Sequence, residues 1–299
     1  MSKVIITGGL GFIFSHVTEY MVKKGYEVIV IDNQTVGSHP EIINNSFKYF
    51  YGHMGNDDSR DFLIKENPDY IIHAAAYSDV DFSIKEAKAV MESNNAATIN
   101  VFEAARKCSN LKKLVYVSTD EVYGECEVRK TEEDIIFPKN PYACSKAFGS
   151  LVRITYDNTY PELKDKTAET RFCNIFGERQ DNRKIMSAIK ESINEGRVLP
   201  VHNGGLGSRE YMYVGNIPEA VELVMLKGDR TYNITLNDSY TVSDLINKVE
   251  TITGKKVNTT PSERKGMDMK YQMDNSRILA LGWEPKYSFE EGLIKYLNA

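Results

Sequence analysis

The chain has 299 residues, and its 37 basic and 42 acidic side chains give it a net charge of −5. Apolar residues make up 41% and charged residues 26% of the sequence, which is typical of a globular protein and excludes a disordered, collagen-like or disulfide-rich chain. The weakly acidic balance argues against nucleic acid as a partner, because such binding needs clustered basic side chains. A length of roughly 300 residues is where one hydrophobic core gives way to two domains.

The sequence also bears on metals, membranes and compartment. No apolar run approaches the roughly 20 residues that cross a bilayer, and the chain enters its first apolar run at Lys3 without a signal-peptide pattern. Neither the 4 cysteines nor the 5 histidines show the close spacing of metal ligands. We therefore expect free thiols, no metal site, no membrane contact and a cytoplasmic location.

The first half of the chain alternates short apolar runs with amphipathic stretches. The predicted strands are residues 4–7, 27–31, 47–51, 70–73 and 113–117. The predicted helices between them are residues 12–24, 59–66 and the long stretch 84–107. The strands are nearly all apolar, as expected for strands buried on both faces of a parallel sheet. Because parallel neighbours need a crossover helix, this alternation predicts a doubly wound α/β sheet.

The pattern changes after about residue 171. Polar and glycine-rich pieces such as residues 202–208 alternate there with short helices such as residues 241–253. We expect a first domain at residues 1–170 and a smaller α/β domain formed mainly by residues 171–299, with some later segments returning to the first sheet.

A glycine-rich turn follows the first strand and opens the first helix. Gly8 permits the tight turn, and Gly11 lets the backbone approach a pyrophosphate at the helix N-terminus. Phe14 stands where this pattern has a third glycine, which normally serves close packing of helix on strand. We expect the phenylalanine to push the helix outward or to point away from the sheet.

An acidic residue, Asp32, ends the second strand about 20 residues after the loop. A carboxylate at this place accepts hydrogen bonds from the adenosine ribose and repels a 2′-phosphate. The loop, Asp32 and the strand–helix–strand context together predict that the chain binds NAD rather than NADP. The alternative is an ordinary glycine-rich turn with a surface aspartate.

A tyrosine and a lysine lie four residues apart at the start of a predicted helix. Asn140 suits the N-cap and Pro141 the first helical position, so Tyr142 and Lys146 share one face. An ammonium beside a phenol favours the phenolate and should lower the pKa of Tyr142. Such a phenol can take a proton from a sugar hydroxyl, although this spacing alone arises often by chance.

Three polar residues follow the fifth predicted strand. Active sites of parallel sheets lie at the carboxyl ends of strands, so Thr119 is expected beside Tyr142. Asp120 and Glu121 are adjacent acids, and two carboxyls in different environments can divide into an acid and a base. The alternative is a solvated acidic turn.

With these motifs, the chain resembles the extended short-chain dehydrogenase/reductases, and most closely the nucleotide-sugar 4,6-dehydratases of the dTDP-glucose type. The similar segments are residues 7–15, 73–76, 118–124, 171–177, 208–214 and 264–274. The resemblance implies a Rossmann-type domain that binds NAD, a smaller C-terminal domain that binds a nucleotide-diphosphate sugar, and a homodimer. The dimer would form through residues 84–107 and the helix that begins near Tyr142.

The resemblance also implies roles for individual residues. Tyr142 would take the proton from O4 while Lys146 holds it toward its ionised form, and Thr119 would bond the reacting oxygen. Glu121 would take the C5 proton, and Asp120 would protonate the departing 6-hydroxyl. The expected cofactor-binding residues are Gly8, Gly11, Phe12, Ile13, Asp32, Asn33, Ala74, Ala75, Asn94, Tyr142 and Lys146. The expected substrate-binding residues are Ser78, Asn174, Arg183, Lys184, Asn203, Arg209 and Arg264, of which Arg209 would grip the diphosphate.

The chain departs from the family pattern at several positions. His53 stands where an acid near the adenine is usual. The usual glutamate, histidine and arginine of the sugar pocket are replaced by Tyr77, Asp79 and Phe82, and Met267 replaces a histidine. These changes leave the sugar and the base undetermined. Two alternatives stay open: a nucleotide-sugar 4-epimerase on the same fold, and a cofactor-binding scaffold without activity, which Phe14 suggests.

Overall fold

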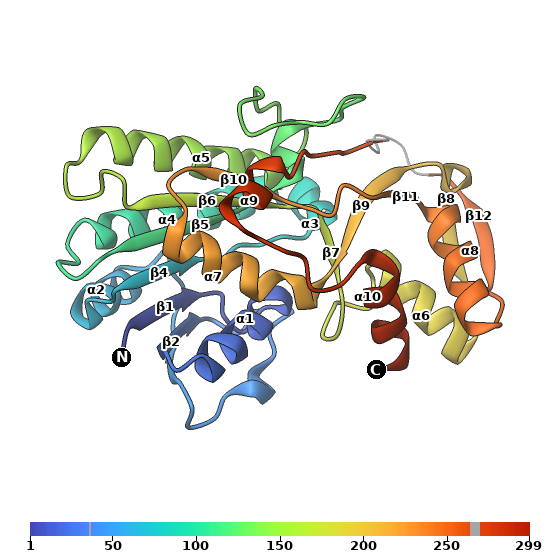
Figure 1. The fold of residues 1–299 in the computed structure, drawn as a ribbon, viewed down its shortest axis with the longest axis horizontal. Coiled ribbons are helices and arrows are strands. Elements are labelled where there is room, and N and C mark those ends of the chain that lie inside the picture. The colour runs from blue at the N-terminus through green and yellow to red at the C-terminus, as the bar shows by residue number, and fades with distance from the viewer. Residues whose placement is uncertain (36, 264–269) are drawn as a thin grey trace.

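A central sheet of seven parallel strands organises the computed structural model, which describes residues 1–35, 37–263 and 270–299 (Figure 1). The strand order is β10-β6-β5-β4-β1-β2-β3. The strands are β1 (Lys3–Thr7), β2 (Glu27–Asp32), β3 (Lys48–Tyr51), β4 (Tyr70–His73), β5 (Lys113–Thr119), β6 (Thr167–Phe172) and β10 (Thr231–Ile234). The order reverses between β1 and β4, so the sheet is doubly wound and the predicted Rossmann-type fold is confirmed.

Helices cover both faces of this sheet. They are α1 (Phe12–Lys23), α2 (Asp57–Glu66), α3 (Val80–Lys85), α4 (Ala87–Ala105), α5 (Pro141–Thr159), α7 (Ile217–Lys227) and α9 (Ser276–Leu281). Alternate residues of each strand point to opposite faces. Ile6 of β1 thus joins the core cluster under α1 and α7, whereas Ile5 joins the cluster under α2, α4 and α5. Burial on both faces is why the strands are nearly all apolar.

A smaller set of elements carries the C-terminal half. A three-stranded sheet has the order β11-β9-β7, and β12 pairs with β8. The elements are β7 (Asn174–Phe176), α6 (Ile185–Glu195), β8 (Leu199–His202), β9 (Ser208–Tyr213), β11 (Ser239–Thr241), α8 (Val242–Thr253), β12 (Thr259–Ser262) and α10 (Phe289–Asn298). Short 3₁₀ turns are η1 (Pro40–Ile42), η2 (Asp120–Tyr123), η3 (Asn203–Gly205) and η4 (Val214–Asn216). Within the described ranges, no helix has the length and apolarity needed to cross a membrane.

The single helix predicted over residues 84–107 is wrong. The backbone leaves helical geometry at Glu86, with φ −122° and ψ 46°, and this break separates α3 from α4. Asp79 starts α3 by accepting a hydrogen bond of 2.9 Å from the Phe82 N–H. The turn is then fixed by tertiary contact, because the Tyr142 N–H donates to Ser83 Oγ at 3.3 Å.

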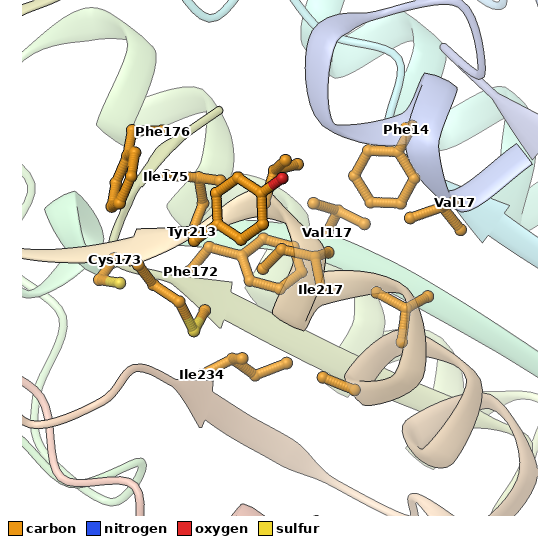
Figure 2. Close-up of a cluster of buried hydrophobic side chains, with 14 of the residues drawn as sticks. Phe14, Val17, Val117, Phe172, Cys173, Ile175, Phe176, Tyr213, Ile217 and Ile234 are labelled. Carbon is orange, nitrogen blue, oxygen red and sulfur yellow. The ribbon is translucent and has the colours of Figure 1, made fainter. Parts of the chain in front are cut away.

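The structure decides one of the two expectations for Phe14. Its side chain is buried and packs against Phe172 of β6, with ring centroids 6.4 Å apart, so it does not point away from the sheet. Figure 2 shows the ring beside Val17 in the cluster that includes Ile217 of α7. The close approach of helix and strand is made instead at Gly9, where an added Cβ would lie 2.9 Å from the Val30 side chain.

Candidate active site

The glycine-rich loop has the geometry that a phosphate site requires. Gly8 has φ 71°, and a Cβ on it would lie 2.7 Å from the backbone nitrogen of Ala75. Gly11 precedes α1, and its N–H donates to the Gly8 carbonyl oxygen at 3.1 Å. The first N–H groups of a helix have no intrahelical acceptor, so those of Phe12 and Ile13 suit an anion. The loop therefore fits the pyrophosphate of a dinucleotide.

Asp32 is fixed at the end of β2. Its carboxylate accepts hydrogen bonds from the Leu10 N–H at 3.1 Å, the Gln34 N–H at 2.8 Å and the Ser38 hydroxyl at 3.2 Å. The loop and the carboxylate are thereby held together as one unit. A fixed negative charge at this place suits a ribose with free hydroxyls and opposes a 2′-phosphate.

A cavity of about 320 Å³ lies beyond the ends of β2 and β3. It is lined by Asn33, Phe50, Tyr51, Gly52, His53, Asn56, Asp58 and Ser59. His53 lies 2.8 Å from Ser93 Oγ and accepts the Gly55 N–H at 3.0 Å through Nδ1. Burial lowers the pKa of His53, which favours the neutral ring on this side of the cavity.

Asn94 supports the cofactor site indirectly. Its side-chain amide donates to the Tyr77 carbonyl oxygen at 3.1 Å and to Ser145 Oγ at 3.0 Å, and its oxygen accepts the Tyr77 N–H at 2.8 Å. The amide thus ties the backbone after Ala74 and Ala75 to helix α5. We expect Asn94 to shape the site through these contacts, because its polar atoms are engaged with the protein.

Helix α5 begins where the sequence predicts. Asn140 is the N-cap, and its side-chain oxygen accepts the Ala143 N–H at 2.8 Å. This start places Tyr142 and Lys146 on successive turns. Lys146 is buried, and its Nζ lies 4.9 Å from the ring centroid of Tyr116 on β5. Burial lowers the pKa of Lys146 to about 8.

The pKa of Tyr142 is raised rather than lowered, contrary to the expectation from its neighbour Lys146. Burial is the largest cause, followed by the negative charges of Glu121 and Asp120, while a hydrogen bond with Thr119 acts in the opposite direction. The sequence placed the lysine one turn from the phenol, but burial and the two carboxylates of η2 raise the pKa of Tyr142. The phenol is therefore neutral in this chain at neutral pH.

The two acids of η2 differ in their surroundings. Asp120 is only 4% exposed, and burial followed by the charge of Glu121 raises its pKa to about 7. Glu121 is partly exposed, and Asn140 donates a hydrogen bond of 2.7 Å to its carboxylate. Two neighbouring carboxyls with different burial and partners can serve as an acid and a base. The alternative reading of a solvated acidic turn does not apply to the buried Asp120.

Arg209 lies on β9, the middle strand of the three-stranded sheet. Its guanidinium lies 4.5 Å from the ring centroid of Tyr271, which is buried. Its charge also acts on Asp120, whose pKa it lowers against the larger effect of burial. The fold therefore brings this predicted diphosphate-binding residue within electrostatic range of Asp120.

The other predicted substrate residues differ in their exposure and in their partners. Arg183 pairs with Asp181 at 2.7 Å and with Asp79 at 3.1 Å, so a substrate would compete with two carboxylates for it. Ser78, Asn174 and Lys184 are exposed and Asn203 is partly buried in η3, so none of the four is fixed by burial in the site. Arg264 and Met267 lie outside the described residues.

Sequence reasoning missed two buried residues beneath α5, Tyr116 and Glu169. Neither belongs to a recognisable motif. The available signal was Gly149 in the interior of a predicted helix, since such a glycine often marks a close approach. A Cβ at this position would overlap with the Tyr116 phenol.

Comparison with known proteins places this chain in a family. The family model described as GDP-mannose 4,6 dehydratase matches residues 5–296. The chain belongs to this family. The family that the resemblance indicated and the Rossmann-type fold are therefore confirmed.

Two relatives in sequence extend this result. The dTDP-D-glucose 4,6-dehydratase of Mus musculus is 30% identical over 98% of this chain and 87% of its own length. A trifunctional UDP-glucose 4,6-dehydratase/epimerase/reductase of Arabidopsis thaliana is 29% identical over 99% of this chain. The chain spans only 46% of that plant protein.

Two solved structures are similar to this chain over nearly its whole length and nearly the whole of their own. UDP-glucose 4-epimerase of Thermotoga maritima, with UDP-glucose, has a TM-score of 0.92 at 29% identity, covering 99% of this chain and 97% of its own. dTDP-glucose 4,6-dehydratase of Bacillus anthracis, in complex with NAD, has a TM-score of 0.90 at 28% identity, covering 100% and 96%. That dehydratase binds NAD, the cofactor that the loop and Asp32 predict for this chain. Because epimerases and dehydratases share this fold, the reaction depends on the site residues.

Proposed function

We propose that the protein is an NAD-dependent nucleotide-sugar 4,6-dehydratase. It would oxidise the sugar at C4, remove water across C5 and C6, and reduce C6. The observation that carries the proposal is the pair of unlike acids, with Asp120 buried at a pKa of about 7 and Glu121 partly exposed beside it. Epimerisation at C4 needs a proton acceptor at O4, whereas loss of water also needs an acid and a base at neighbouring carbons.

The oxidation step uses the residues of α5 and β5. NAD, when bound, supplies the oxidant for C4 and the reductant for C6. Gly8, Gly11 and Asp32 would hold its pyrophosphate and ribose. Tyr142 must be ionised to take the O4 proton, and the positive charge of Lys146 favours this ionised phenol. Thr119 hydrogen-bonds with Tyr142 and orients it toward the reacting oxygen.

The elimination step uses the two acids. A ketone at C4 makes the C5 proton acidic, and Glu121 accepts it. Asp120 still holds its own proton near neutral pH and gives it to the departing 6-hydroxyl, which leaves as water. Protonated Asp120 also removes one of the two negative charges that keep Tyr142 from ionising. The proton on Asp120 therefore has two roles: it is donated to the leaving 6-hydroxyl, and until then it removes a negative charge beside the Tyr142 phenol.

Substrate binding would divide between the two halves of the chain. Residues 1–170 would bind NAD and carry the acids, and residues 171–299 would mainly bind the nucleotide-diphosphate sugar. Arg209 would contact the diphosphate through its planar guanidinium. Ser78, Asn174, Arg183, Lys184 and Asn203 are proposed as further substrate contacts.

We also propose a homodimer formed through α4 and α5. Val90, Val101 and Phe102 of α4 are fully buried in the protein's own core and so are not available to a partner. Leu151 and Ile154 of α5, by contrast, are 55% and 44% exposed. Light scattering tests this proposal, and a monomer mass at every concentration would exclude it.

Product mass is the test of the reaction. The purified chain would be incubated with a panel of nucleotide sugars and its bound cofactor identified by mass spectrometry. A product lighter than its substrate by one water supports the dehydratase, and an isomer of the same mass supports a 4-epimerase. No turnover, with no NAD bound on titration, supports a scaffold without activity.

A further inference from the structure

A buried ionic cluster lies between α5 and the sheet. Glu169 of β6 is fully buried, and its Oε1 accepts hydrogen bonds of 2.7 Å from Ser150 Oγ and of 2.7 Å from Arg171 Nε. Arg153 Nε lies 3.5 Å from Oε2. Burial alone would raise the pKa of Glu169, but the two guanidinium groups outweigh it and the pKa is lowered. Glu169 is therefore a fixed anion beneath the catalytic helix.

The same cluster touches the turn that carries Lys146. Ser150 lies one turn further along α5, and its Oγ is also 3.3 Å from the Lys146 carbonyl oxygen. Tyr116 donates a hydrogen bond of 3.1 Å to that carbonyl oxygen, while its ring faces the Lys146 ammonium. Gly149 makes this contact possible, since any larger residue would overlap with the Tyr116 phenol. Lys146 is thus held through its backbone and its side chain.

The groups around Lys146 differ in charge. His73 of β4 and Glu169 of β6 interact with it electrostatically, the Tyr116 ring of β5 faces it, Tyr142 lies one turn away on α5, and Arg171 of β6 is hydrogen-bonded to Glu169. Burial and the lysine itself lower the pKa of His73 to about 3, so this ring is neutral. Burial raises the pKa of Tyr116 well above its usual value. Glu169 is the anion whose charge favours the protonated lysine.

We propose that Glu169 is a positioning residue for Lys146, which it keeps in place and in its ammonium form through Ser150 and through its own charge. The inference rests on the proposed role of Lys146 in the oxidation step. A buried ammonium is costly without a counter-charge, and the fold supplies one from Glu169, a residue outside the recognised motifs.

The variant Glu169→Gln tests the charge while keeping the size and the hydrogen bond. Lys146 would be titrated directly by NMR in protein labelled at its lysine side chains, with the signal assigned from Lys146→Arg. We expect the titration midpoint to fall by about one pH unit in Glu169→Gln. The matched control is Arg153→Gln, which disturbs the same cluster but leaves the carboxylate, so the midpoint should not fall.

Kinetics supply the second readout. The rate of C4 oxidation is followed in a single turnover by the absorbance of the reduced cofactor. In Glu169→Gln the pH at which this rate falls should be lower than in the parent by the same amount as the Lys146 midpoint, with KM unchanged. If Glu169→Gln does not fold, the double variant Glu169→Gln/Arg171→Gln removes opposite charges together, and the midpoint is expected to fall there too.

The outcomes separate this inference from the proposed function. An unchanged midpoint in a folded variant overturns the inference, even if Tm falls, because Glu169 would then be a packing anchor only. A fall of the midpoint in Arg153→Gln equal to that in Glu169→Gln overturns it as well. A parent chain that turns over no nucleotide sugar refutes the proposed function, whereas the NMR titration still decides the role of Glu169.

Discussion

Thr119 and Asp120 form a hydrogen bond of 3.0 Å, in which the threonine Oγ1 donates to Oδ1 of the aspartate. The other oxygen, Oδ2, is buried and has no hydrogen-bond partner in the part of the chain that the structure describes. An ionised carboxylate in this position would leave charge on an unsolvated oxygen. The arrangement therefore favours the protonated acid, and the free Oδ2 is where the proton for the leaving hydroxyl would be held.

The raised pKa of Asp120 makes stability depend on pH with a definite sign. Its ordinary value is 3.8 and its value in the fold is about 7. Between these values the folded chain keeps a proton that the unfolded chain has lost, so raising the pH across this window destabilises the fold. Asp120→Asn is neutral throughout, and its Tm should rise relative to the parent across the window and then level off. Thermal unfolding at a series of pH values measures this, and a Tm difference independent of pH contradicts the raised pKa.

Glu121→Gln should separate the two halves of the reaction. The amide can still bond with Asn140 but cannot accept the C5 proton. We expect the oxidation at C4 to form the reduced cofactor as before, while overall turnover falls by roughly 10²-fold or more. Glu125→Gln is the matched control, because Glu125 is exposed and pairs with Lys139 at 3.1 Å. Turnover of Glu121→Gln at the parent rate would show that another group removes the proton.

The stacking of Tyr271 on Arg209 should affect substrate affinity. A cation–π contact of this kind contributes about 1 kcal/mol, so Tyr271→Leu is expected to raise KM about fivefold with little change in kcat. Tyr271→Phe keeps the ring and should behave like the parent. Steady-state kinetics compare the two variants, and equal effects of leucine and phenylalanine would mean that the ring face does not hold Arg209.

Gly149→Ala should destabilise the protein although alanine is the better helix former. Helix propensity alone would favour alanine by about 1 kcal/mol, but the added Cβ overlaps with Tyr116. Overpacking of this kind costs about 1–3 kcal/mol, so we expect a net loss in the free energy of unfolding. Urea unfolding measures it, and the double variant with Tyr116→Val should recover part of the loss. A single variant as stable as the parent would mean that the ring can move aside.

Local patterns were enough to predict much of the fold. The strand predicted at residues 70–73 is β4, and the helix predicted from Asn140 and Pro141 begins there because capping depends on adjacent residues. The break at Glu86 was missed, because the helical pattern continues through it and the contact that fixes the turn comes from α5. Phe14 was recognised as a departure, but its partner Phe172 lies far along the chain.

The sequence by itself determined where most strands of the first sheet lie, where the helix of Tyr142 begins and which polar residues follow a strand, because these features depend on neighbours along the chain. Only the tertiary structure decided their charge states. The pKa of Tyr142 is raised by burial and then by the two carboxylates of η2, although Lys146 is its neighbour on α5. Arg183 is paired with Asp79 across the fold. Burial and charge depend on neighbours in space, which the spacing of a motif does not record.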